Sequence, residues 1–175
     1  YYHSVRRVRV LVHGDDFVSV GGASDARWFK KILENRFEIK TLIVGSGEGE
    51  EAEATNLNRI IRVTEHGGEL EADQRHADTI SKKMNLKEAE SVKTPAEDDK
   101  RCQEEEDAVP LNEVDSRKFR ELAARANYLA LDRLDIQYAT KEVCSGMSAP
   151  TQSHLRRLRR LARYLKGTQR IVVHY

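Results

Sequence analysis

The sequence contains few of the residues that mark a secreted or membrane protein. Its 175 residues include only two cysteines, three prolines and one tryptophan. Cys102 and Cys144 lie far apart and match no zinc-ligand spacing, so we expect reduced thiols in an intracellular protein. No run of about 18 apolar residues occurs, and the first residues lack the apolar core of a signal peptide. The sequence therefore predicts neither a membrane span nor secretion.

The composition limits the size of the hydrophobic core. Hydrophobic residues make up 39% of the chain and charged residues 34%, which suits one modest domain or two small ones. The chain starts at Tyr1 without a methionine, so we expect a fragment of a longer polypeptide.

The net charge of +1 conceals three segments of different charge. Residues 1–44 carry a net charge of +3, residues 45–116 carry −11, and residues 117–175 carry +9. A basic segment of this kind is typical of a surface that contacts phosphates. We therefore expect the C-terminal third to contact nucleic acid and the acidic middle to stay away from it.

Asp15 and Asp16 are the main candidates for a chemical role. They lie between two short runs of strand-forming residues, and Gly14-Asp15 favours a tight hairpin turn because both residue types tolerate positive φ. Two carboxylates at the tip of a rigid hairpin suit Mg²⁺ or Mn²⁺, which prefer oxygen ligands. The alternative is ordinary turn chemistry, with an acidic pair that simply stays in water.

Hydrophobic periodicity and turn residues predict a mixture of strands and helices before residue 94. The expected elements after the hairpin are a helix from Ser24 to Asn35 capped by Ser24, a strand over 37–44, a solvated loop over 45–51, a second hairpin of 57–63 and 69–71, and a helix over 73–84 started by Asp73. Trp28 and Phe29 are expected in the core. These elements make a small α+β unit.

The remainder of the chain is predicted to be an acidic linker followed by helices. Residues 95–115 contain Pro95, Pro110 and the acids of Glu104–Asp107, with almost no apolar residues to bury. Helices are expected from a cap at Ser116, over 135–145 and over 151–166. The first and the last have an apolar stripe at three- and four-residue spacing. The fold class is therefore α+β, with an α-helical C-terminal segment.

Several segments, in order, are similar to one known family. They are Leu57–Val63, Glu71–Ile80, Val92–Pro95, Arg133–Ile136, Pro150–His154 and Arg163–Thr168. With Asp15-Asp16, they resemble the copia-type retrotransposon reverse transcriptase, from its metal-binding hairpin to the segment before its ribonuclease H domain. The resemblance implies a polymerase palm over 1–94, an acidic linker over 95–115 and a thumb-like or connection-like helical segment over 116–175.

The same resemblance implies an RNA-directed DNA polymerase that uses two Mg²⁺ or Mn²⁺ ions, with Asp15 and Asp16 as catalytic metal ligands. The family places a third acid and the fingers upstream of this hairpin, and residues 1–14 contain no acid. We therefore expect the isolated chain to be inactive. His13-Gly14 replace the aromatic residue and its neighbour that usually precede the two acids, and Gly-Asp-Asp also occurs in viral RNA-dependent RNA polymerases.

The implied partners are an RNA or DNA template–primer duplex, deoxynucleoside triphosphates, and the integrase and ribonuclease H domains of the polyprotein. No membrane partner is implied, and the expected location is a cytoplasmic particle or the nucleus.

Basic residues in two places are the candidates for nucleic-acid contact. Arg59 and Arg62 match in position the strand near the primer grip of the family. The others lie on the last predicted helix: Arg156, Arg157, Arg159, Arg160, Arg163 and Lys166. Arginine suits bidentate contact with phosphates without reading bases. The alternative for both groups is a solvated basic surface.

A second class of function also fits the sequence. The altered His13-Gly14, the missing partner acid and the acidic insertions are consistent with a degenerate or repurposed remnant. Such a remnant would keep the fold and bind nucleic acid or protein without catalysis.

Overall fold

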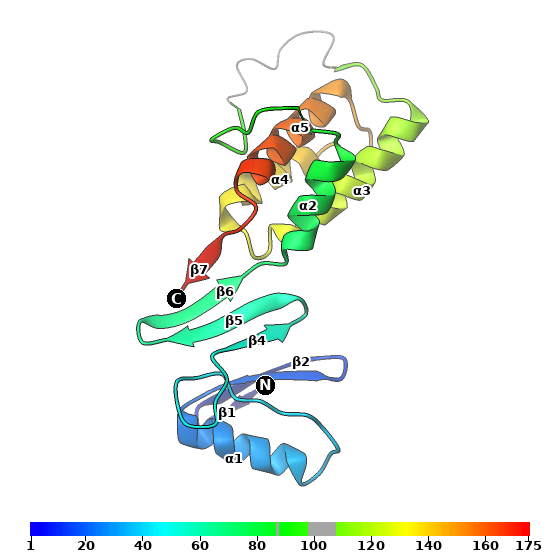
Figure 1. Cartoon of the computed structure of the whole chain (residues 1–175). Helices are drawn as coiled ribbons and strands as arrows, with labels where there is room; N and C mark the ends of the chain where they lie inside the picture. The colour runs from blue at the N-terminus through cyan, green and yellow to red at the C-terminus, as the bar shows by residue number, and fades with distance from the viewer. Residues whose placement is uncertain (87, 98–107) are drawn as a thin grey trace. The chain divides into compact units, whose positions relative to one another are not determined.

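The structure is a computed structural model that describes residues 1–86, 88–97 and 108–175. This part of the chain forms two compact units. The first comprises Tyr1–Ala54 and Arg62–His66, and the second comprises Thr55–Ile61 and Gly67–Tyr175. The described residues are a mixture of α-helices and β-strands, with two sheets (Figure 1).

The first unit contains a small antiparallel sheet and one helix. Strands β1 (Tyr2–His3), β2 (Val8–His13) and β3 (Asp16–Val20) pair in that order. Helix α1 (Ala23–Glu34) follows directly. The predicted hairpin at Asp15-Asp16 is therefore confirmed.

Helix α1 begins one residue earlier than predicted, and its cap differs. Gly22 occupies the N-cap position without a side-chain hydrogen bond, so the prediction of Ser24 as the cap was wrong. Trp28 lies 5.4 Å from the His3 ring and 4.2 Å below the Arg6 guanidinium carbon. No residue of α1 is buried, so Trp28 and Phe29 are half-buried rather than core residues.

The strand predicted over 37–44 is absent. In this segment only Val44 makes a β-bridge, with Glu51, because the rest of the apolar run finds no partner strand. The loop predicted over 45–51 is confirmed as irregular. However, it is not wholly solvated, because the Glu50 carboxylate accepts hydrogen bonds from the Arg27 guanidinium at 2.5 Å and from the Gly47 N–H at 2.9 Å.

The second sheet contains β4 (Glu53–Asn56), β5 (Arg59–Thr64), β6 (Gly67–Glu71) and β7 (Val172–His174), paired in that order. The hairpin of β5 and β6 agrees with the prediction, with shifted limits. Leu57 and Asn58 are not strand residues, because both adopt positive φ (48° and 62°) between β4 and β5. The predictions lacked β7, which pairs antiparallel with β6.

Four α-helices of the second unit pack on one another (Figure 1). They are α2 (Gln74–Lys83), α3 (Glu113–Leu129), α4 (Gln137–Cys144) and α5 (Gln152–Gly167), with a short 3₁₀ turn, η3 (Leu134–Ile136), before α4. The apolar stripes predicted on these helices form one core. Its fully buried members include Ile80, Phe119, Leu122, Ala126, Ile136, Val143, Leu158, Leu161 and Leu165.

The N-terminal cap of α2 agrees with the prediction, whereas that of α3 differs. Asp73 caps α2 by accepting a hydrogen bond from the Arg75 N–H, as predicted. Asn112, rather than Ser116, caps α3 and accepts from the Asp115 N–H. Ser116 is buried inside the helix, where its hydroxyl donates to the Leu111 carbonyl.

The predicted acidic linker is shorter than expected at its C-terminal end, because Leu111 is buried and α3 begins at Glu113. Cys102 and Glu104–Asp107 lie outside the described residues. Cys144 is a free, half-buried thiol, and burial raises its pKa.

The compact units differ from the division expected at residues 94 and 115. Helix α2 packs against both α3 and α5 within the second unit. Across the described ranges, no helix is long and apolar enough to cross a membrane.

Candidate functional site

Asp15 and Asp16 lie at the tip of the β2–β3 hairpin. His13 pairs with Asp16, so Gly14 and Asp15 form a two-residue turn. Only Gly14 has positive φ (62°), which fits a turn that requires this conformation at its first central residue. Both aspartates are exposed. The register places the His13 and Asp16 side chains on the same face of the hairpin.

These two acids have the donor chemistry of a Mg²⁺ or Mn²⁺ site but not the number of ligands. Carboxylate oxygens suit both ions. However, in residues 1–86, 88–97 and 108–175 no group of three or more His, Cys, Asp or Glu side chains is placed to hold a metal ion. The described residues therefore provide at most part of such a site.

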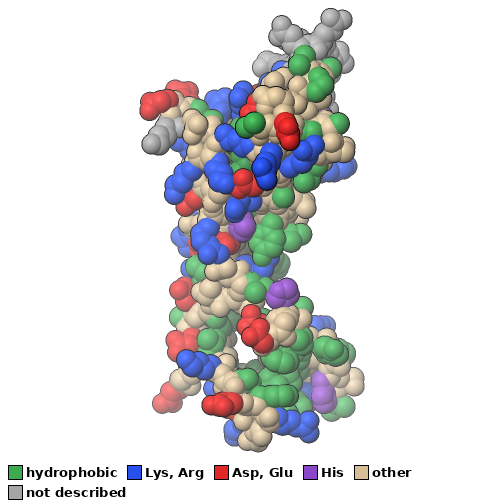
Figure 2. Space-filling model, turned by 90° about the vertical axis from the view of Figure 1, so that its right-hand side faces the viewer, with side chains coloured by type: hydrophobic (Ala, Val, Ile, Leu, Met, Phe, Trp, Pro, Cys, Tyr) green, Lys and Arg blue, Asp and Glu red, His purple; other side chains and the backbone are tan. Residues whose placement is uncertain are grey.

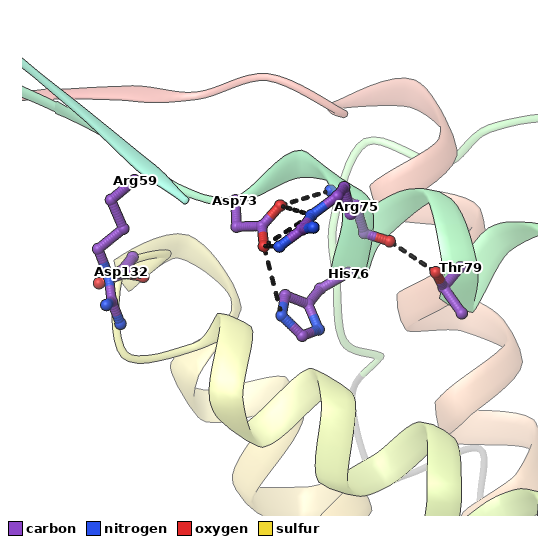
Figure 3. Close-up of polar contacts among 6 residues, drawn as sticks. All are labelled: Arg59, Asp73, Arg75, His76, Thr79 and Asp132. Carbon is purple, nitrogen blue, oxygen red and sulfur yellow. Dashed lines mark hydrogen bonds and ion pairs between the residues drawn. The ribbon is translucent and has the colours of Figure 1, made fainter. Parts of the chain in front are cut away.

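Arg59, a candidate for primer contact, is held by an intramolecular ion pair. Its Nε donates to Asp132 Oδ2 at 2.7 Å, and both side chains are drawn in Figure 3. The Arg59 guanidinium carbon also lies 5.5 Å from the centre of the Tyr128 ring. Burial would lower the Arg59 pKa, but the hydrogen bond and charge of Asp132 outweigh it and raise the pKa. Arg59 and Asp132 are 73 positions apart in the sequence, so no local pattern predicts their contact.

Arg62, the other candidate on β5, pairs with a more exposed partner than Arg59 does. Its Nε donates to Glu53 Oε2 at 2.8 Å, and more than half of the Glu53 side chain is exposed. An exposed pair of this kind contributes little to stability.

A second polar cluster lies at the start of α2, close to Arg59 (Figure 3). The Asp73 carboxylate accepts from the Arg75 backbone at 3.0 Å and from the Arg75 guanidinium at 2.7–3.1 Å. These bonds, the Arg75 side-chain bond first, lower the Asp73 pKa. His76 Nε2 is 3.7 Å from Asp73 Oδ2, which is too long for a hydrogen bond. Burial lowers the His76 pKa. The hydrogen bonds of this cluster stay within the first turn of α2, whereas the His76 ring contacts the Tyr128 ring of α3, with 4.9 Å between ring centres.

The segment Arg133–Ile136, which is one of those that resemble the retrotransposon family, has a structural role in this fold. Arg133 is 1% exposed, and its guanidinium donates to both Asp135 carboxylate oxygens at 2.7 and 2.8 Å and to the Thr168 carbonyl at 2.9 Å. The Tyr164 hydroxyl donates to Asp135 Oδ2 at 2.9 Å. These bonds connect the turn before α4 to the end of α5.

Three of the predicted nucleic-acid contacts on α5 hold the preceding segment of the chain. Lys166 Nζ donates to the carbonyls of Leu86 and Ala89 at 2.9 Å, and Arg163 Nε donates to the Glu90 carbonyl at 2.8 Å. Arg160 binds the Glu97 carboxylate and the Thr94 hydroxyl. Leu86 and the segment 89–97 therefore lie against α5.

The other basic residues of α5 are placed differently. Arg157 donates to Glu142 Oε2 on α4 at 3.3 Å. Arg156 is half-buried, and Arg159 is exposed. On the face in Figure 2, many Lys and Arg side chains gather over the helices of the second unit. The predicted nucleic-acid interface is therefore partly used for contacts within the chain.

Comparisons with known proteins relate part of the chain to a retrotransposon. The chain is 41% identical over 55 residues to a retrovirus-related Pol polyprotein from transposon RE1 of Arabidopsis thaliana, a match that covers 31% of this chain and 4% of the polyprotein. It is 43% identical over 54 residues to the uncharacterized mitochondrial protein AtMg00810 of the same plant, covering 31% of this chain and 22% of that protein. The matches thus span only a small part of each relative. No family model and no solved structure matches the chain.

Proposed function

We propose that this chain is part of a retrotransposon reverse transcriptase, comprising the hairpin with two metal-binding aspartates and the helices that follow it. The β2–β3 hairpin is the observation that carries this proposal, because it exposes Asp15 in its two-residue turn and Asp16 next to it, at the start of β3. The partial similarity to a transposon Pol polyprotein supports the same origin.

The proposed activity of the parent protein is RNA-directed DNA synthesis from deoxynucleoside triphosphates with Mg²⁺ or Mn²⁺. The isolated chain is proposed to be inactive, because its described residues provide two carboxylates and no third ligand beside them. A partner acid and the fingers would come from elsewhere in the polyprotein.

The second unit is proposed to bind the phosphate backbone of a template–primer duplex through α5. Arg159 suits this role best, since it is exposed and makes no side-chain contact with a described residue that would compete with a phosphate. Each phosphate contact steepens the salt dependence of affinity by about 0.9 in a double-logarithmic plot.

Fluorescence anisotropy with a labelled RNA–DNA duplex at several salt concentrations tests the backbone contact. We expect Arg159→Gln to weaken binding and reduce the salt slope by about one. Arg36→Gln, an exposed arginine of the first unit, is the matched control and should change neither value. Equal duplex affinity and equal salt slope in the unmodified chain, Arg159→Gln and Arg36→Gln would contradict a duplex contact at α5.

The alternative is a non-catalytic remnant, and the incomplete set of metal ligands favours it. Calorimetric titration with Mn²⁺ distinguishes a polymerase fragment from such a remnant. For a polymerase hairpin we expect binding that is lost in Asp15→Asn and kept in Glu65→Gln, an exposed acid between β5 and β6. No difference between these proteins would favour the remnant.

A further inference from the structure

A hollow in the second unit lies between the segment 95–97, α4 and α5. Pro95, Tyr138 and Ala139 supply apolar and aromatic surface to its lining. All these residues belong to one compact unit.

Tyr138 gives the hollow an aromatic ring that the core does not use. The residue lies in the first turn of α4 and is 62% exposed. Most large apolar side chains of this helical unit that face inward are fully buried. An exposed aromatic ring beside guanidinium groups is the kind of surface on which a nucleic-acid base stacks.

Three guanidinium groups line the same hollow, on Arg156, Arg157 and Arg160 of α5. Two carboxylates, of Glu97 and Glu142, face them, so the lining carries one net positive charge. Arg157 is held by Glu142 and Arg160 by Glu97. These pairs fix the guanidinium groups beside the ring before any ligand arrives, which reduces the entropy lost on binding.

From these observations we infer that the hollow binds one unpaired nucleotide of a single-stranded nucleic acid, with its base on Tyr138 and its phosphate near the arginines. The inference builds on the proposed function, because the strand would be the single-stranded extension of the duplex bound by α5. It adds a site for single-stranded nucleic acid, which a backbone contact alone does not provide.

The test compares two DNA duplexes by fluorescence anisotropy with the whole chain. One is blunt, and the other carries a short single-stranded oligo-dT extension. We expect the extended duplex to bind about fivefold or more tightly, since stacking of one base is worth about 1–3 kcal/mol. Tyr138→Ala should abolish this difference, whereas Tyr138→Phe should keep it because the ring remains.

Tyr175→Ala is the matched control, because Tyr175 is 74% exposed and lies outside the hollow. It should leave the preference for the extended duplex unchanged. Equal binding of both duplexes by the unmodified chain, or an unchanged preference in Tyr138→Ala, would overturn the inference.

The same titrations separate this inference from the proposed function. Tight, salt-dependent binding of the blunt duplex without an added effect of the extension would refute the nucleotide site alone. Tyr138-dependent binding of free oligo-dT without binding of the blunt duplex would support the site and refute the duplex contact.

Discussion

The two compact units bury very different amounts of apolar surface. In the first unit, Val8 is the one fully buried hydrophobic residue among those described. In the second unit, a cluster of buried residues from α2, α3, α4 and α5 forms a continuous core. Because each fully buried large apolar side chain contributes roughly 1.5–3 kcal/mol, the second unit has far more of the stabilisation that a domain needs.

The exposed apolar residues of the first unit lead to the same conclusion. Leu11, Phe17 and Val20 of its sheet are 62%, 42% and 65% exposed. Figure 2 shows hydrophobic side chains at the surface of this unit. The hairpin that carries Asp15 and Asp16 thus belongs to the unit with the smaller hydrophobic core. This agrees with the proposal that other parts of a polymerase would complete a metal site there.

The largest expected effect is the loss of Arg133. Arg133→Ala leaves the Asp135 carboxylate and the Thr168 carbonyl without their buried donor, and should lower the free energy of unfolding by about 3–5 kcal/mol. Urea denaturation followed by circular dichroism measures this. Arg117→Ala, at an exposed position of α3, is the control. A change as small as in the control would mean that Arg133 does not hold the turn before α4 to the end of α5.

A pair of leucine substitutions compares the two units directly. Leu158→Ala, in the core of the second unit, should lower the free energy of unfolding by about 2–5 kcal/mol. Leu11→Ala, on the exposed sheet of the first unit, should change it by less than about 0.5 kcal/mol. Thermal and urea unfolding check both, and similar losses would remove the proposed difference between the units.

Gly146→Ala should have an intermediate effect. A Cβ atom at this position would lie 2.7 Å from His154 Nδ1 and closer still to two other ring atoms. We expect a loss of about 1–3 kcal/mol from this overpacking. Gly68→Ala is the control, because a Cβ there meets no atom within 4 Å. A melting temperature unchanged in both variants would show that the His154 ring moves freely.

The smallest expected effect is a pH dependence from His154. Burial is the main cause that lowers the His154 pKa, and its Nδ1 accepts a hydrogen bond from the Thr151 N–H at the start of α5. The folded form therefore favours the neutral ring. Its contribution to stability should be present above the unfolded pKa of about 6.5 and be lost as the pH falls through the folded value.

Urea denaturation between pH 7.5 and about 5 measures this loss. His154→Gln, which cannot be protonated in this range, should reduce the dependence. An identical pH profile in both proteins would assign the effect to other groups.

The helical core and its caps show how far the sequence predicts the fold. Leu122 in α3 and Leu158 in α5 each belong to an apolar stripe with helical spacing, so their burial follows from the local sequence pattern. The failed strand over 37–44 had apolar residues but no partner strand, and β7 is short and pairs with distant β6. Strand pairing depends on contacts far apart in the sequence, and no local pattern specifies them.

The candidate site residues also fall into two groups: those that a local sequence pattern places, and those whose position depends on distant contacts. The placement of Asp15 at a hairpin tip follows from Gly14 and the flanking strands. The contacts of Arg59 with Asp132 and of Arg163 with the Glu90 carbonyl each join residues 73 positions apart. Sequence identifies such arginines as basic surface but does not show which ones the fold already uses.

Amide hydrogen exchange of the whole chain, resolved by peptide, tests the difference between the units most directly. Exchange reports local opening, which is fastest where few apolar contacts are buried. We predict that the amides of β2 and β3, on either side of Asp15, exchange much faster than those of α3, α4 and α5. Equal protection of the hairpin and these helices would contradict the claim that the hairpin proposed to bind metal lies in the less stable unit.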